Sequence, residues 1–157
     1  MMESFMDLEQ GYRWLKSRNL DAETVILIMN DDTVFDADFL AQAFEVMNNS
    51  LHSLLQAQIY SQQTGQLIDS GVHADWRRMT FEVTKDPALV NCFCTTALFL
   101  RLKDFITIGG FYPRLLPHFA SDYEFTMRAH RQGFQLITDP SVRLSVNEQT
   151  TWNYSAN

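Results

Sequence analysis

The sequence predicts one α/β domain, spanning residues 1–157, in which a mixed central sheet is flanked by helices. Residues 3–18 repeat apolar side chains at helical spacing. Residues 24–29 form a continuous apolar run, which is typical of a strand covered on both faces, as in a parallel sheet. Residues 121–133 carry the signals that begin and end a further helix. A chain of 157 residues is long enough for one domain with a sizeable core.

The N-terminal half is predicted to fold as helix, strand and helix. One face of the first helix holds Phe5, Leu8, Tyr12 and Leu15. The second helix is predicted to follow Asp36, because aspartate is a residue type that caps helix N-termini. Its inward face is predicted to hold Leu40, Ala43, Phe44 and Met47.

The C-terminal half is predicted to alternate strands with two helices. Strands are expected at residues 54–61, 92–101 and 134–139, short extended pieces or a long hairpin across 67–83, and a short helix near 102–108. Pro140 is predicted to end the last strand. In the helix at 121–133, Ser121 and Glu124 match a capping box, and Gly133 suits the position just past the helix end.

Charge and composition exclude several classes of protein. The formal net charge is -7 and no run of Lys or Arg exceeds two residues, which argues against nucleic-acid binding. No apolar run approaches the roughly 20 residues of a transmembrane helix, and the N-terminus lacks the pattern of a signal peptide. Cys92 and Cys94 are interpreted as core thiols on one face of a strand, in a reducing compartment. We therefore expect a cytoplasmic protein.

Asn30, Asp31 and Asp32 directly follow the predicted strand at residues 24–29. Open α/β sheets bind ligands beyond the carboxyl ends of their strands. Carboxylates are hard ligands that suit Mg²⁺ or Mn²⁺, often together with phosphates of a substrate. The alternative is a polar turn between strand and helix, for which Asn and Asp are common.

Two further segments could carry chemistry. Asp122 lies at the start of the predicted helix at 121–133, where the positive end of the helix dipole favours an ionised carboxylate, as a general base requires. The alternative is that Asp122 only complements the dipole. Gly109 and Gly110 either allow close backbone approach to a ligand or simply end the preceding helix.

Taken together, these motifs resemble family 2 glycosyltransferases with the GT-A fold. The stretch "IMNDDT" followed by "FDADFL" resembles the D-x-D-like metal-binding segment of that family. The stretch "GGFYPRLLPHFASDYEFTMRAHRQGF" resembles its later GGF segment and acid-rich helix start. The resemblance covers residues 11 to about 139, with both motifs in the family's order.

The resemblance implies a metal-dependent enzyme that transfers a sugar with inversion. Asp32 and Asp31 would bind Mg²⁺ or Mn²⁺, while Asn30, Asp31 and Gly110 would contact the nucleotide-sugar donor. Asp122 would be the catalytic base. The acceptor would be a glycan or a lipid-linked molecule, so peripheral membrane contact is compatible with this interpretation.

The resemblance also lacks a part of the family's domain. Family members normally begin with nucleotide-binding strands, whereas here the metal-binding strand starts at residue 24. We therefore expect the acceptor-side part of a GT-A domain, truncated at its N-terminus, with an exposed sheet edge that a homo-oligomer would cover. The alternative function is a non-catalytic remnant or fragment that acts as an interaction module.

Overall fold

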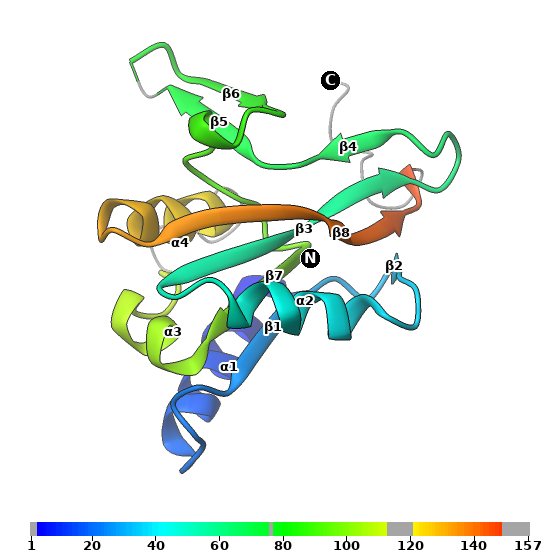
Figure 1. Cartoon of the computed structure of the whole chain (residues 1–157). Helices are drawn as coiled ribbons and strands as arrows, with labels where there is room; N and C mark the ends of the chain where they lie inside the picture. Colours follow the sequence, from blue (N-terminus) through cyan, green and yellow to red (C-terminus); the bar gives the residue numbers. More distant parts are fainter. Residues whose placement is uncertain (1–2, 76, 113–120, 149–157) are drawn as a thin grey trace.

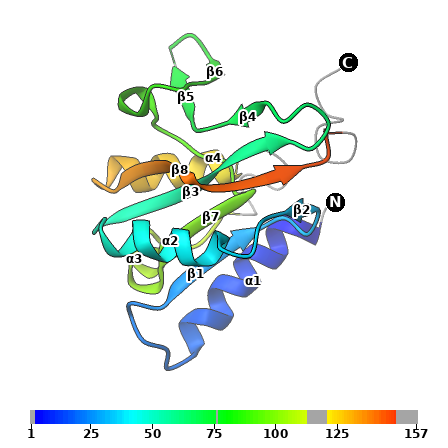
Figure 2. The same ribbon diagram turned by 45° about the vertical axis from the view of Figure 1, so that its right-hand side comes forward.

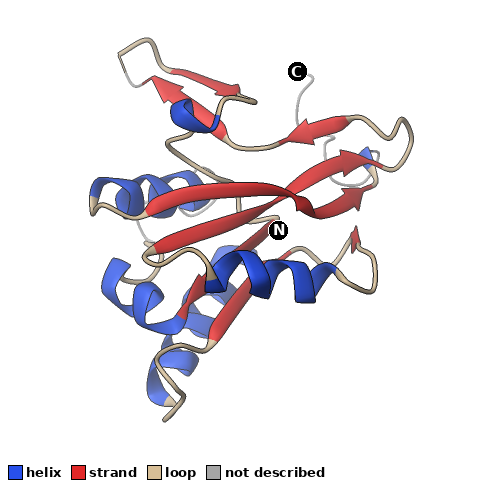
Figure 3. Ribbon diagram, viewed as in Figure 1, coloured by secondary structure: helices blue, strands red, loops and turns tan. Residues whose placement is uncertain are grey.

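The computed structural model describes residues 3–75, 77–112 and 121–148, which form the mixed α/β architecture expected from the sequence (Figures 1 and 3). The helices are α1 (Glu3–Ser17), α2 (Phe39–Asn48), α3 (Leu102–Ile108) and α4 (Ser121–Arg131), with a 3-10 turn at Pro87–Leu89. The strands are β1 (Val25–Met29), β2 (Thr33–Val34), β3 (Ser53–Ser61), β4 (Leu67–Asp69), β5 (Val72–Asp75), β6 (Thr80–Val83), β7 (Ala97–Arg101) and β8 (Gln135–Val146).

The central sheet has the strand order β1-β7-β3-β8-β2, and β4 also pairs with β3. Strand β7 is antiparallel to both β1 and β3, whereas β3 and β8 are parallel. Strands β1, β3 and β8 therefore run in the same direction, and their carboxyl ends lie along one edge of the sheet. Ligands of open α/β sheets bind at such an edge.

Helices cover both faces of the sheet, and strand β7 shows how the core is divided. Leu98 and Leu100 of β7 pack in the cluster that α1, α3 and α4 cover. Ala97 and Phe99, which point to the other face, pack in the cluster beneath α2. Figures 1 and 2 show α2 on its own over one face of the sheet.

Strand β1 differs from its prediction as a strand buried within a parallel sheet. Among the described strands it pairs only with β7, in antiparallel register, so it lies at the sheet edge. Of its five residues only Ile28 is buried. The prediction of an exposed edge at this strand is therefore confirmed, whereas the prediction of burial on both faces is wrong.

Helix α2 is present, but its predicted inward face is only half right. Phe39, Ala43 and Met47 are buried, whereas Leu40 and Phe44 are 44% and 46% exposed. The helix also begins later than expected, with Asp38 rather than Asp36 at its N-cap. The helix packs on β3 and β8, so the side chains on its far side lie in the open.

Two strands have ends that the sequence misplaced. The strand predicted at residues 92–101 begins only at Ala97, so residues 92–96 precede β7. Strand β8 passes through Pro140 and continues to Val146, since its register against β3 shifts between Ala57 and Gln58 and leaves the proline in an irregular stretch. Within the described residues, no helix has the length and apolarity needed to cross a membrane.

Candidate active site

The segment Asn30–Asp32 forms the turn between β1 and β2, at the carboxyl end of β1. Asn30 and Asp31 are exposed and Asp32 is half-buried. The backbone N–H of Asn30 donates to the carbonyl of Thr96 at 3.1 Å. The hydroxyl of Thr33 donates to the carbonyl of Asn30 at 3.0 Å, which closes the turn. The turn is thus tied to the residue that precedes β7.

Asp122 lies in the first turn of α4 and is partly buried. Its Oδ1 accepts a hydrogen bond from the backbone N–H of Tyr123 at 2.8 Å. Burial raises the pKa of the Asp122 carboxyl above its usual value, although hydrogen bonding to backbone N–H groups, that of Tyr123 first, acts in the opposite direction. A carboxylate with a raised pKa is suited to accept a proton.

The two predicted motifs meet at the segment just before β7. The carbonyl of Thr96 accepts the N–H of Asn30, and the backbone N–H of Phe93 donates to the hydroxyl of Thr126 in α4 at 2.9 Å. Residues 91 apart in the sequence, Asp31 and Asp122, therefore belong to one region, at the sheet edge where β1 ends and β7 begins. The structure places the Asn30–Asp32 turn and the start of α4, which carries Asp122, against the same segment, and the roles of these residues stay predictions.

Asp69, at the end of β4, is a member of this region that the sequence analysis missed. It is 2% exposed. Its Oδ1 accepts from the backbone N–H of Gly71 at 2.7 Å, and its Oδ2 accepts from the thiol of Cys94 at 3.4 Å. The charge of Asp69 adds to the effect of burial in raising the pKa of Asp122. In the sequence, "LIDSG" indicates only a turn, and no signal links it to residue 94.

Both cysteines are free thiols, as expected, although they precede β7 instead of belonging to it. Burial raises the pKa of Cys92 to about 12. Burial also raises the pKa of Cys94, with a further contribution from the charge of Asp69. Thiols with such pKa values stay protonated at neutral pH, and Cys94 accordingly acts as a hydrogen-bond donor towards Asp69 and Thr96.

Arg128 of α4 holds the segment that follows α3. Its guanidinium donates to the carbonyls of Ile108 and Gly110 and forms two bonds, at 2.7 and 2.9 Å, with the Glu124 carboxylate. Glu124 is therefore engaged with Arg128. Ser121 Oγ is buried without a hydrogen-bond partner among the described residues, so the predicted capping box does not form.

The close approach that Gly110 allows is to helix α1. A Cβ atom at Gly110 would lie 2.4 Å from Glu9 Oε2 and 2.7 Å from Tyr12 Cδ1. Packing of α1 against this segment explains the glycine in structural terms. A role of Gly110 in donor binding stays a prediction.

A family model described as "Glycosyl transferase family group 2" matches residues 25–156. The chain belongs to this family. The match begins at the first residue of β1 and includes Asn30–Asp32, Asp69 and Asp122, so it covers every residue of the candidate site. No curated protein compared with the chain matches it.

Membership of glycosyl transferase family 2 implies a sugar donor and an acceptor as substrates, and members of the family typically use a divalent metal ion. The described residues contain no group of three or more His, Cys, Asp or Glu that could hold a metal ion. The turn of this family 2 domain nevertheless offers two carboxylates, Asp31 and Asp32. That donor set fits Mg²⁺ or Mn²⁺, because such ions commonly bind one or two carboxylates together with substrate phosphates.

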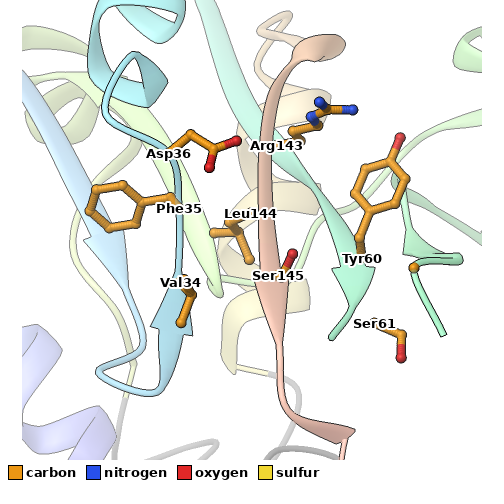
Figure 4. Close-up of a pocket in the computed structure, with 9 residues that line it drawn as sticks. Val34, Phe35, Asp36, Tyr60, Ser61, Arg143, Leu144 and Ser145 are labelled. Carbon is orange, nitrogen blue, oxygen red and sulfur yellow. The ribbon is translucent and has the colours of Figure 1, made fainter. Parts of the chain in front are cut away.

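A cavity of about 270 Å³ opens beside β2 of this family 2 domain, close in sequence to Asp32 (Figure 4). Its lining consists of Val34, Phe35, Asp36, Tyr60, Ser61, Gly65, Arg143, Leu144 and Ser145. Figure 4 shows the Asp36 carboxylate turned towards Arg143. None of the candidate site residues lines this cavity, so it lies outside the candidate site.

Proposed function

We propose that this family 2 domain transfers a sugar from a nucleotide-sugar donor to an acceptor hydroxyl, with inversion at the anomeric carbon. The observation that supports this most strongly is the segment of residues 93–96, which bonds to Asn30 through Thr96 and to α4, one turn after Asp122, through Phe93. A base and a pair of metal-binding carboxylates at one sheet edge are the minimum that such a reaction requires.

In the proposed reaction, Asp122 accepts the proton of the acceptor hydroxyl. The acceptor oxygen forms a bond to the anomeric carbon as the bond to the diphosphate oxygen breaks, so a single displacement inverts the configuration. Asp31 and Asp32 would hold Mg²⁺ or Mn²⁺, which when bound neutralises charge on the departing nucleoside diphosphate. Asn30, the residue before these carboxylates, would contact the donor.

The donor site is tested by thermal unfolding. UDP or GDP with Mn²⁺ is expected to raise the melting temperature of the chain by roughly 5–10 °C at a hundredfold excess over Kd. Asp32→Ala should abolish this shift, because it removes a ligand of the metal ion. Asp38→Ala is the matched control, since Asp38 is an aspartate at the N-cap of α2 that makes no side-chain capping bond.

No stabilisation by any nucleoside diphosphate at millimolar concentration would argue against transfer by this chain. That outcome would favour the second candidate, a non-catalytic family 2 domain that acts through its surfaces. The observation behind this candidate is the open edge of β1, which pairs only with β7 among the described strands.

We also propose that the chain self-associates through this edge. Val25, Leu27 and Met29 of β1 are half-buried on the face that carries α2, and Leu40 and Phe44 lie exposed on α2, the helix that covers this face. An unpaired edge strand next to apolar side chains is a surface that proteins usually cover. A second copy of the chain would bury both features.

Light scattering across a hundredfold range of concentration should reveal a dimer that dissociates on dilution. Phe44→Lys should weaken the dimer by at least tenfold in Kd, because it places a charge in the apolar contact. Leu51→Lys is the control, since Leu51 is 74% exposed and belongs to neither α2 nor β1. A chain that stays monomeric at every concentration would contradict self-association.

A further inference from the structure

Strands β5 and β6 form a two-stranded hairpin that is separate from the central sheet and projects from the body of the domain (Figure 1). Its register pairs Val72 with Val83 and Ala74 with Phe81. Directly paired residues of an antiparallel hairpin point to the same side, so these four side chains share one face. The opposite face holds His73, Asp75, Thr80 and Glu82.

The apolar face of this hairpin is only half covered. Val72 and Ala74 of β5 are 2% and 6% exposed, in a cluster with Cys92 and Met127. On β6, Phe81 is 38% and Val83 is 50% exposed. Met79, at the hairpin turn, is 67% exposed. We name Met79, Phe81 and Val83 the apolar shelf.

The apolar shelf is continuous with the candidate active site. The ring of Phe81 stacks on that of Tyr123, with centroids 5.5 Å apart and planes 14° from parallel. Tyr123 directly follows Asp122, and its backbone N–H donates to the Asp122 carboxylate. A ligand on the shelf would therefore extend towards the proposed base.

Cations flank the apolar shelf in a chain whose formal net charge is -7. Arg77 and Arg78 lie at the hairpin turn and Lys85 follows β6. In the described part of the chain, Arg77 and Lys85 form no ion pair, and Arg78 reaches only Asp75, at 3.8 Å. Guanidinium and ammonium groups next to an apolar surface suit a molecule that carries both a hydrocarbon chain and a phosphate.

We propose that the apolar shelf binds the hydrocarbon chain of an amphiphilic, lipid-linked acceptor, whose hydroxyl then lies at Asp122. The inference rests on the proposed function and narrows its acceptor class. It commits to a single bound amphiphile as the occupant. Each methylene group buried on the shelf should increase affinity by about fourfold, up to the length that the shelf covers.

The test is a methyl NMR titration of the full chain, without donor or metal, using monomeric octyl β-D-glucoside. We expect saturable shifts of the Met79 and Val83 methyl groups, and no such shifts with methyl β-D-glucoside, which has the same sugar and no chain. Octyl phosphate should bind more tightly than octyl glucoside, and Arg77→Ala with Arg78→Ala should remove this advantage.

Variants locate the binding surface. Phe81→Ala and Val83→Ser should each weaken octyl glucoside binding by about tenfold, whereas the control Leu51→Ser should not change it. The comparison of the two glucosides on the unsubstituted chain keeps the test valid if a variant fails to fold.

Several outcomes would overturn the inference. They are equal shifts with methyl glucoside, shifts confined to the Leu40 methyl groups, a response only to vesicles of anionic phospholipid, and coverage of the shelf by a second copy of the chain. Because no transfer is measured, the result is independent of catalysis. If the chain binds the alkyl ligand but never transfers sugar, the proposed function is wrong and the inference about the apolar shelf still holds.

Discussion

Asp122→Asn is expected to lower the rate of sugar transfer by roughly 10²- to 10⁴-fold, the usual contribution of a general base. The amide has nearly the same shape as the carboxylate but cannot accept the proton of the acceptor hydroxyl. Release of nucleoside diphosphate in the presence of acceptor measures this rate. Binding of nucleoside diphosphate with Mn²⁺ should be unchanged, because Asp122 is not one of the proposed metal ligands.

The dependence of the rate on pH provides a second test of Asp122. Burial raises the pKa of this carboxyl, and only the ionised form acts as a base. The rate should therefore fall as the pH is lowered through that raised pKa. Asp69→Asn removes a neighbouring negative charge, so it should move this fall to lower pH. Asp38→Asn should leave both the rate and its pH profile unaltered, and an equal loss of rate in that control would contradict the assignment.

Arg128→Ala is expected to lower the free energy of unfolding by about 3–5 kcal/mol. The side chain of Arg128 is 17% exposed, and its removal leaves the Glu124 carboxylate and the carbonyls of Ile108 and Gly110 without their donor. It also removes the stacking of the guanidinium on Tyr112, where the guanidinium carbon lies 4.5 Å from the ring centroid. Urea denaturation measures the change.

Arg13→Ala is the matched control for Arg128. Arg13 also pairs with a glutamate four residues away on its helix, Glu9, but its side chain is 76% exposed. Removal of such a surface pair should cost less than about 1 kcal/mol. Similar losses for the two variants would mean that Arg128 does not hold the segment after α3.

The sequence predicted the order of the elements because each helix and most strands have a strong local pattern. Local pattern could not show how far the neighbouring elements cover them. Leu40 and Phe44 have the spacing of a buried helix face, yet they lie exposed because α2 packs on β3 and β8 and leaves its far side open. Proline usually ends a strand, yet the register shift opposite Ala57 and Gln58 accommodates Pro140 within β8.

The candidate site shows the same division between local and tertiary information. Asn30, Asp31, Asp32 and Asp122 could be proposed from their places after a strand and at a helix start. Asp69 could not, because its membership depends on β4 pairing with β3 beside the start of β7, which brings it to the Cys94 thiol.

The capping box failed for a related reason. Ser121 and Glu124 have the right spacing, but Glu124 binds Arg128, which the sequence alone could not pair with the carbonyls after α3.

The central claim is that the Asn30–Asp32 turn and the start of α4 form one donor-binding site. Paramagnetic broadening of amide NMR signals by Mn²⁺ in the presence of UDP tests it directly, because the broadening depends steeply on the distance from the ion. The account predicts the strongest broadening at residues 30–33, with clear broadening at Thr95, Thr96 and Tyr123, and loss of all of it in Asp32→Ala. Broadening at residues 30–33 that leaves Thr95, Thr96 and Tyr123 sharp would contradict a shared site.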